Sequence, residues 1–364
     1  MNVAIVAPLV SPIREPQRGG SQAFVSELAR GLVRRGHDVR VYAASGSEVP
    51  GVEVIDAGVD HRELAATLYR PSGGAAAPST VAEQAFARVY DLVRANRHDV
   101  IHNHAFDAPA VDLASTLSVP VVHTIHLPPD AAVADALRAA VRRNPRPVLA
   151  CVSVSHSNAW RRIVPIDAIL PPYVPTARIH FSPTASSGAV FAGRFSPEKG
   201  AADAIAIARL ADVEIDVFGD VYDAEYAREH IDPRRSEPGV AVHSAVPPMA
   251  LWEAMSRAAV VLCPANCDEP FGMVAAEAQA CGTPVVGFRR GALPEVIIDG
   301  ATGFLVEPGD HQAAAKAVRR VSALSRWACR EHAERKLDIG RSLDAHERLY
   351  ERVASAALGA RAGV

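Results

Sequence analysis

Two glutamates, Glu269 and Glu277, stand eight positions apart in a segment that also predicts open backbone N–H groups. The stretch 272–280 predicts a short helix that is apolar nearly all round, so a glutamate in it needs a partner or water. The first N–H groups of a helix have no acceptor within it, and an anion can bind there. Glu277 would lie about five residues into the helix, roughly 7.5 Å along its axis. One carboxylate could then bind one end of an elongated ligand and the other a hydroxyl further along, although two solvent-facing carboxylates fit the spacing equally well. The open N–H groups would be those of Phe271, Gly272, Met273 and Val274.

Arg194 and Lys199 form a second candidate pair, in the stretch Gly-Arg-Phe-Ser-Pro-Glu-Lys-Gly. This stretch follows a predicted strand at 189–192 and precedes a predicted helix at 201–210, which is a common position for phosphate groups in α/β proteins. Two cations held there could bind a diphosphate. Pairing with Glu198 at the surface explains the same residues equally well.

The N-terminal half offers Gly19, Gly20 and His126 as candidates. The two glycines follow a predicted strand and precede a predicted helix at 21–35 capped by Ser21, so backbone N–H groups could approach a phosphate closely. His126 would lie just past the carboxyl end of a strand, where open α/β sheets bind their ligands. A plain tight turn and a structural histidine are the alternatives. The glycine loop lacks the G-x-G-x-x-G pattern and the acidic residue of a nicotinamide site.

Strand and helix patterns alternate along the whole chain, which predicts an α/β fold with two doubly wound parallel sheets. The length of 364 residues exceeds what one hydrophobic core usually holds, so we expect two domains. A proline-rich stretch at 170–187 breaks regular structure and fits the connection between them. The expected division is an N-terminal domain at 1–178, a C-terminal domain at 179–343 and a charged tail helix at 344–364.

The composition argues against several classes of protein. The chain is 49% hydrophobic and 22% charged with a net charge of −3, which argues against non-specific nucleic-acid binding. No apolar run reaches the roughly 18 residues of a membrane span, and the N-terminus lacks the basic start of a signal peptide. Five scattered cysteines fit reduced thiols in a cytoplasmic protein and lack the pairing of a zinc site. A basic helix predicted at 130–144 could contact an anionic membrane, but it lacks apolar side chains to insert. Its arginines and the one that follows it are Arg138, Arg142, Arg143 and Arg146.

Two motifs of the chain closely resemble those of the family 4 glycosyltransferases. They are E-x-F-G-x4-E followed by a G-T-P-V-V strand, and G-R-x4-K-G, in the order that the family has them. The resemblance covers nearly the whole chain. It implies a retaining, metal-independent enzyme of the GT-B fold, in which two Rossmann-like domains face each other across a cleft and the tail helix crosses back onto the first domain.

The resemblance also implies roles for the candidate residues. Arg194 and Lys199 would hold the diphosphate of a nucleotide-sugar donor. Glu269 would contact hydroxyls of the donor sugar, and Glu277 would bind the nucleotide ribose.

In the N-terminal half, the resemblance places Gly19 and Gly20 beside the donor diphosphate. His126 would lie near the reacting carbon and the acceptor. The same role does not extend to the neighbouring histidines His102, His104 and His123.

The implied reaction moves a hexosyl unit from a nucleotide sugar to a hydroxyl of a small, soluble acceptor, such as a natural-product scaffold. Nothing marks a guanine pocket, so UDP-glucose or UDP-N-acetylglucosamine is the expected donor, and the lack of a D-x-D motif agrees with metal independence. The alternatives are a lipid-acceptor enzyme using GDP-mannose at a membrane, a nucleotide-sugar epimerase, a non-catalytic binder and a glycoside hydrolase. Glu269 and Glu277 fit a hydrolase poorly because its two carboxylates face each other across one bond.

Overall fold

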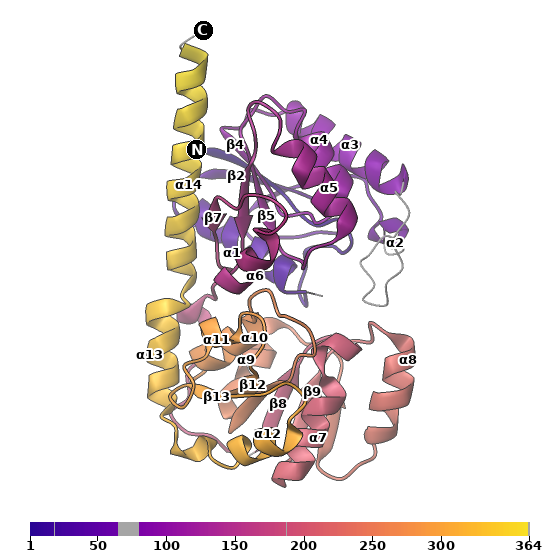
Figure 1. Cartoon of the computed structure of the whole chain (residues 1–364), viewed down its shortest axis with the longest axis vertical. Coiled ribbons are helices and arrows are strands. Elements are labelled where there is room, and N and C mark those ends of the chain that lie inside the picture. Colours follow the sequence, from indigo (N-terminus) through magenta and orange to yellow (C-terminus); the bar gives the residue numbers. More distant parts are fainter. Residues whose placement is uncertain (18, 65–79, 187, 363–364) are drawn as a thin grey trace. The chain divides into compact units, whose positions relative to one another are not determined.

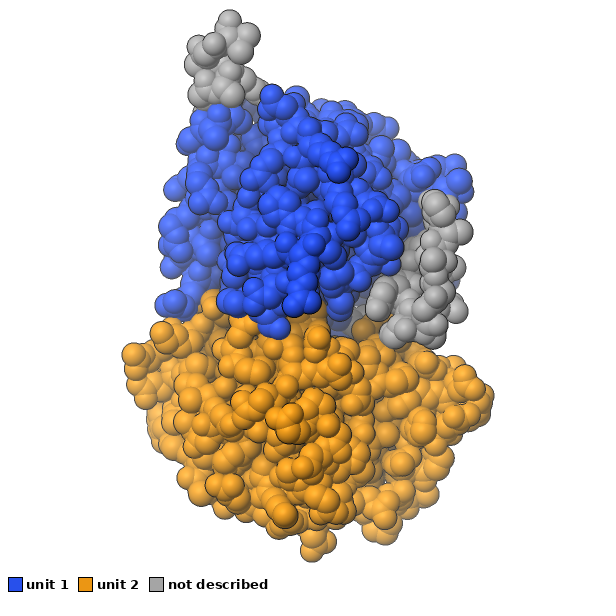
Figure 2. Space-filling view, in the orientation of Figure 1, with its two compact units in different colours: residues 1–172, 339–364 blue, residues 173–338 orange. Residues whose placement is uncertain are grey.

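The computed structural model describes residues 1–17, 19–64, 80–186 and 188–362. Its contacts divide the chain into two compact units, which Figure 2 shows in different colours. Unit 1 contains Met1–Pro172 and Ile339–Val364, and unit 2 contains Tyr173–Asp338. The chain therefore leaves unit 1 six positions before the boundary predicted at 178.

Unit 1 is built on a seven-stranded parallel sheet with the strand order β3-β2-β1-β4-β5-β6-β7. Helices cover both of its faces (Figure 1), which confirms the predicted α/β architecture. The strands are β1 (Asn2–Val6), β2 (Asp38–Ala43), β3 (Glu53–Asp56), β4 (Val100–Asn103), β5 (Val121–Ile125), β6 (Val148–Cys151) and β7 (Ala168–Ile169). The helices are α1 (Gly20–Arg34), α2 (His61–Leu64), α3 (Thr80–Arg94), α4 (Ala108–Ala114), α5 (Ala131–Ala140), α6 (Val154–Trp160) and α14 (Ile339–Ala362).

The interior strand β1 is apolar from Val3 to Val6 because both of its faces are covered. Ala4 and Val6 pack in one cluster with side chains of α3, while Val3 and Ile5 point to the opposite face and are equally buried. Parallel strands of this kind bring their carboxyl ends to one edge of the sheet. The loops that follow β1, β4 and β5 therefore lie at the same edge of unit 1.

Helix α1 begins one residue earlier than predicted, and its cap is Gly19 rather than Ser21. Gly19 has an extended backbone and supplies no side chain, so the helix start carries no side-chain cap. Ser21 lies inside the first turn, where its hydroxyl donates to Gln22 Oε1 at 2.9 Å instead.

Helix α5 is shorter than predicted and ends at Ala140 rather than at 144. A proline follows at Pro145, and the residue before a proline is disfavoured in the helical region. The basic residues are therefore not all on one helix. Arg138 pairs with Asp135 at 2.7 Å, and Arg146 pairs with Asp167 at 2.6 Å.

The tail helix α14 packs on unit 1, against α1 and β4. Its contact with α1 is close, because a Cβ added at Gly31 would come 2.7 Å from the Leu343 side chain. The Arg35 guanidinium donates to Asp344 at 2.8 Å and to Glu347 at 2.5 Å. The helix begins at Ile339, five positions before its predicted start at 344.

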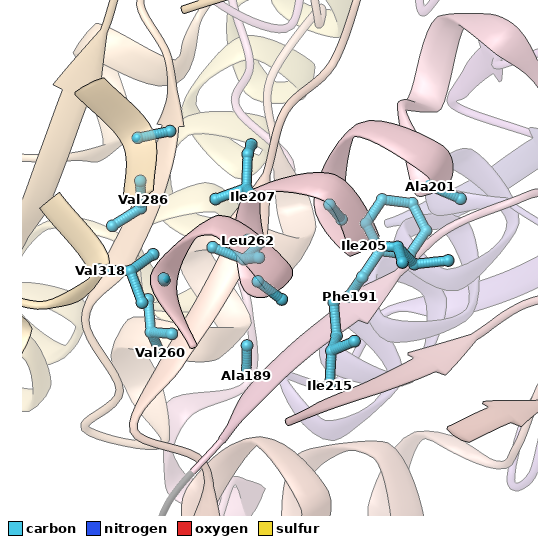
Figure 3. Close-up of a cluster of buried hydrophobic side chains, with 14 of the residues drawn as sticks. Ala189, Phe191, Ala201, Ile205, Ile207, Ile215, Val260, Leu262, Val286 and Val318 are labelled. Carbon is cyan, nitrogen blue, oxygen red and sulfur yellow. The ribbon is translucent and has the colours of Figure 1, made fainter. Parts of the chain in front are cut away.

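Unit 2 has a six-stranded parallel sheet in the order β10-β9-β8-β11-β12-β13. Its strands are β8 (Ala189–Ala192), β9 (Ile215–Phe218), β10 (Val240–His243), β11 (Val260–Cys263), β12 (Val285–Phe288) and β13 (Gly303–Val306). Its helices are α7 (Ala201–Ala211), α8 (Ala224–Tyr226), α9 (Pro248–Arg257), α10 (Met273–Ala280), α11 (Leu293–Val296), α12 (His311–Val318) and α13 (Arg326–Lys336). Figure 3 shows the core, where Ile205 and Ile207 of α7 meet side chains of β8, β9 and β11.

A buried guanidinium ties α13 to the rest of unit 2. Arg326 donates to the carbonyl oxygens of Ser256 and Ala258 at 2.6 and 2.8 Å, and to Thr283 Oγ1 at 2.9 Å. These carbonyls belong to the end of α9, where a cation is favourable for the helix dipole. Within the described residues no helix combines the length and apolarity needed to cross a membrane.

Candidate functional site

Lys199 and Glu269 form an ion pair at the edge of unit 2 where β8 and β11 end. Lys199 closes a 3₁₀ turn, Pro197–Lys199, and its ammonium donates to Glu269 Oε1. The two side chains are 25% and 17% exposed, so the pair is partly shielded from water. Burial alone would lower the pKa of Lys199, but the Glu269 carboxylate outweighs it and the pKa lies above its ordinary value. Lys199 is therefore a fixed cation at neutral pH.

A close backbone contact holds the Lys199 turn against the loop that carries Glu269. Gly200 has a φ of +75°, and a Cβ there would lie 2.1 Å from the carbonyl oxygen of Pro264. The Asn266 N–H also donates to the carbonyl of Glu198 at 2.9 Å. Gly200, the second glycine of G-R-x4-K-G, is therefore needed for this close backbone contact, which the sequence pattern alone does not reveal.

Gly291 holds Glu269 from the other side, which the motifs did not indicate. A Cβ at Gly291 would come 2.4 Å from the backbone nitrogen of Glu269, and its φ is +55°. The next residue, Ala292, donates its N–H to the Glu269 carbonyl at 2.9 Å. Arg290 braces the same loop, since its guanidinium donates to Asp268 at 2.9 Å. The sequence signal was the stretch Gly-Ala-Leu-Pro-Glu at 291–295, which extends the resemblance but which turn chemistry explains equally well.

Arg194 lies near Lys199 and is held by an aromatic ring. Its guanidinium carbon sits 4.2 Å from the centre of the Tyr222 ring, and Nη2 is 3.6 Å from Glu198 Oε1. The side chain is 39% exposed. Its charge acts on Lys199, whose pKa it lowers slightly against the larger effect of Glu269. Tyr222 is a site residue that sequence reasoning missed, because it follows β9 and no motif connects it to Arg194.

The pKa of the Cys263 thiol responds to several charged groups of unit 2. Cys263 is the last residue of β11, and burial raises its pKa to about 12, with further upward contributions from Glu269 and Glu277 and an opposing one from Lys199. The charges of three predicted donor residues therefore act on one half-buried thiol. Glu277 itself is half-buried on α10.

The start of α10 is open, as its sequence predicted. Gly272 is its N-cap with a φ of +95° and offers no side-chain cap. Within the described residues, four consecutive backbone N–H groups have no acceptor. They are those of Phe271, Gly272, Met273 and Val274. Such a helix start can bind an anion, and it follows directly on the loop whose Glu269 pairs with Lys199.

Unit 1 presents a second open helix start. Gly19 and Gly20 begin α1, and the first N–H groups of this helix have no side-chain cap. Gln22 in the same turn donates to Ser11 Oγ at 2.8 Å, which ties the helix start to the loop after β1. This is the position that the sequence predicted for a phosphate, at the carboxyl edge of the unit 1 sheet.

His126 follows β5 directly and is 9% exposed. Its Nε2 lies 2.9 Å from Nδ1 of His104, a neighbour to which the motif assigned no role. Burial, with smaller contributions from His156 and His346, lowers the pKa of His126 to about 3, so the ring is neutral at physiological pH. The residue after it, Leu127, is anchored by two ring N–H donors of α6. His156 Nε2 and Trp160 Nε1 lie 2.7 and 2.9 Å from the Leu127 carbonyl.

The described part of the chain contains no group of three or more His, Cys, Asp or Glu side chains that could hold a metal ion. All five cysteines are free thiols.

The sequence matches two models of glycosyltransferase families. "Glycosyltransferase Family 4" matches residues 18–170, and "Glycosyl transferases group 1" matches residues 178–336. A D-inositol 3-phosphate glycosyltransferase of Arthrobacter sp. is 30% identical over 86% of this chain and 84% of its own length. One from Mycolicibacterium smegmatis is 30% identical over 91% of this chain and 86% of its length.

Solved structures of the same fold cover nearly the whole chain. The sucrose-phosphate synthase of Thermosynechococcus elongatus superposes with a TM-score of 0.77 at 19% identity, over 98% of this chain and 100% of its own. Anabaena HepE in complex with UDP-glucose gives a TM-score of 0.72 at 19% identity, over 96% and 100%. The chain therefore belongs to the family 4 glycosyltransferases and is an enzyme of the GT-B fold.

Proposed function

We propose that this enzyme transfers a hexosyl unit from a nucleotide-diphosphate sugar, UDP-glucose or UDP-N-acetylglucosamine, to a hydroxyl of a small, soluble acceptor in the cytoplasm. The observation that supports this most is the partly shielded ion pair between Lys199 and Glu269, in the loop that leads to the open start of α10. HepE, a structural neighbour, was solved with UDP-glucose, which agrees with a nucleotide-sugar donor.

In the proposed reaction the charge that develops on the departing diphosphate meets groups already in position. Arg194 and Lys199 supply two cations, and the open N–H groups of α10 supply fixed dipoles. An incoming diphosphate would compete with Glu269 for the Lys199 ammonium. The open start of α1 at Gly19 and Gly20 would offer N–H donors to a phosphate of the donor.

The carboxylates would select and orient the sugar nucleotide. Glu277, on the buried helix α10, would accept hydrogen bonds from the ribose hydroxyls. Glu269 would accept them from the donor sugar and hold its ring in place. His126 would contribute a neutral hydrogen-bonding ring beside the acceptor, since its low pKa removes it as a cation.

We propose further that the configuration of the donor sugar is retained and that no metal ion is needed. The reaction would need no protein nucleophile, because the acceptor would attack the same face of the sugar from which the diphosphate departs. The cations and helix dipoles described above would supply the electrostatic stabilisation that a metal gives in other enzymes.

The acceptor that we favour is a polyhydroxylated ring carrying a phosphate. The relatives with 30% identity are named for D-inositol 3-phosphate, a small acceptor of that kind. Unit 1 would bind it near His126.

The test is an incubation of the purified enzyme with UDP-glucose, UDP-N-acetylglucosamine or GDP-mannose, each with and without an inositol phosphate. Release of nucleoside diphosphate and a glycosylated product by mass spectrometry, only when both substrates are present, is the expected result. NMR of the anomeric proton of the product shows whether the configuration of the donor sugar is retained. A parallel incubation with EDTA shows whether the reaction needs a metal ion.

Other results would identify the alternative functions. An epimerised donor without any acceptor would favour an epimerase, and transfer only to lipid vesicles would favour a membrane enzyme. A thermal shift with a nucleotide sugar but no transfer would indicate a binder, since a ligand at 100 times its Kd stabilises by about 2.7 kcal/mol.

A further inference from the structure

Two neutral imidazoles at the carboxyl edge of the unit 1 sheet share one hydrogen bond. His104 Nδ1 and His126 Nε2 are 2.9 Å apart, and both rings are buried. One of these nitrogens must carry the hydrogen and the other must accept it. The direction of the bond therefore decides which nitrogen of His126 carries its proton.

The surroundings of His104 favour one direction. Its other nitrogen, Nε2, is fully enclosed and has no partner among the described residues. The neighbouring His102 ring, 4.0 Å away between centroids, offers no free nitrogen, because its two are taken by Tyr350 and Thr124 at 2.5 and 2.7 Å. If His104 accepted the shared bond, its enclosed Nε2 would be an orphaned N–H donor. Orphaned buried donors are rarer than unfilled acceptors, so the hydrogen belongs on His104 Nδ1.

The remaining nitrogen of His126 faces outward. Its Nδ1 has no partner among the described residues and is not one of their fully enclosed polar atoms. With His104 donating to Nε2, the neutral His126 ring must carry its own hydrogen on Nδ1. An N–H donor then reaches the surface of unit 1 just past β5.

We propose that His104 is a positioning residue that fixes His126 in the Nδ1–H form, so that His126 donates a hydrogen bond to an oxygen of the donor sugar or the acceptor. The assignment of the tautomer is independent of the proposed function. Only the identity of the oxygen that accepts the hydrogen bond rests on that function. The neighbours of the His126 ring are themselves fixed: His104 lies against the tilted ring of His102, and the Leu127 carbonyl is anchored by α6.

The tautomer is tested directly by long-range ¹⁵N–¹H NMR of the full-length protein labelled with ¹⁵N-histidine. A His126→Gln sample identifies the His126 signals by their loss. At pH 7 the expected pattern is a protonated Nδ1 and an unprotonated Nε2. A protonated Nε2 on His126 would overturn the proposal, and this readout needs no enzymatic activity.

Kinetics with a matched pair of variants test the consequence. His104→Leu removes the donor, whereas His104→Asn keeps an N–H near the position of Nδ1. We expect kcat to fall about tenfold in His104→Leu with the KM for the nucleotide sugar within twofold, because one hydrogen bond is worth about that factor. His104→Asn should recover most of the loss. His123→Leu, at a buried histidine bonded to Asn103 instead, is the control for general damage to the sheet.

Wild-type kcat in His104→Leu, or equal losses in the Leu and Asn variants with an unchanged His126 tautomer, would contradict the positioning role. If the wild-type enzyme transfers no sugar to any acceptor, the proposed function fails, and the NMR experiment still decides the tautomer.

Discussion

Lys199 and Glu269 lie 70 positions apart in the chain and meet as a partly shielded ion pair. The pair joins the loop after β8 to the loop after β11, so the cation proposed for the diphosphate and the carboxylate proposed for the sugar position each other. Replacing either Lys199 or Glu269 should therefore disturb the binding of both the diphosphate and the sugar.

Replacing Lys199 by alanine is expected to lower kcat by about 10²- to 10³-fold, the usual effect of removing one donor to a developing negative charge. The fold should survive, because the side chain is 25% exposed and water can reach the Glu269 left behind. Steady-state kinetics with circular dichroism as the folding check measure this. The matched control is Lys316→Ala, an exposed lysine on α12. Near-normal turnover in Lys199→Ala would remove Lys199 from the site.

Replacing Glu269 by glutamine should change the pH dependence of donor binding. In the wild type the carboxylate holds the pKa of Lys199 above its ordinary value against the effect of burial. Without the carboxylate only burial remains as the main influence, so the pKa of Lys199 should fall. The KM for the nucleotide sugar should then begin to rise at a lower pH in the variant than in the wild type, as the ammonium loses its proton. Parallel KM profiles between pH 7 and 10 would contradict this account.

Replacing Gly291 by alanine should displace Glu269 without touching the substrate. The new Cβ would lie 2.4 Å from the Glu269 nitrogen and 2.5 Å from its carbonyl oxygen, both backbone atoms that cannot swing away. Gly300→Ala is the matched control, since its φ of +77° imposes similar backbone strain but no atom lies within 4 Å of the added carbon. We expect kcat/KM to fall at least tenfold more in Gly291→Ala, because small misplacements of a reacting group are costly. Equal effects of the two substitutions would mean that strain alone acts.

These contacts mark where the sequence was sufficient and where it was not. The alternation of strands and helices predicted both sheets, and strand β8 has the bounds predicted at 189–192, because burial on both faces leaves a short apolar run. Arg194, Lys199, Glu269 and Glu277 were found because each belongs to a local motif with a fixed spacing. Helix ends were less accurate, as α1 shows, because a glycine with an extended backbone served as cap in place of a serine.

The supporting residues could not be found in this way. Tyr222 stacks on Arg194, Gly291 contacts Glu269, and His104 bonds to His126, all across pairs of loops that only the folded sheets bring together. A local pattern carries no information on such pairs. Parallel order implied only that these loops share an edge.

Replacing Tyr222 by leucine should loosen Arg194 and weaken donor binding. A cation over an exposed ring is worth about 0.5–1 kcal/mol, so the KM for the nucleotide sugar should rise about two- to fivefold with little change in Tm. Tyr222→Phe keeps the ring and should leave KM within error. Titration of the nucleotide sugar by calorimetry separates binding from turnover. Equal affinities in the Leu and Phe variants would show that the ring does not hold Arg194.

The buried histidines of unit 1 should make its stability depend on acid. Burial lowers the pKa of His123 and His346 to about 4 and that of His126 to about 3, whereas in the unfolded chain they titrate near 6.5. Below pH 6.5 the unfolded state therefore binds protons that the folded state does not, and the free energy of unfolding falls as the pH falls. Each histidine contributes about 1 kcal/mol per pH unit in this window, and the full stability is present above it.

Trp160 is the single tryptophan of unit 1, so its fluorescence in a Trp252→Phe, Trp327→Phe background follows the unfolding of this unit in urea. The urea midpoint should drop steeply between pH 6.5 and 4.5 and stay level between pH 7 and 8. His346→Gln removes one titrating group, and it should reduce the steepness by about one proton while lowering the plateau through the lost contact with the Ser342 carbonyl. A midpoint that does not change from pH 7 to 4.5 would mean that these rings take up protons in the folded state, and the neutral form assigned to His126 would then be wrong.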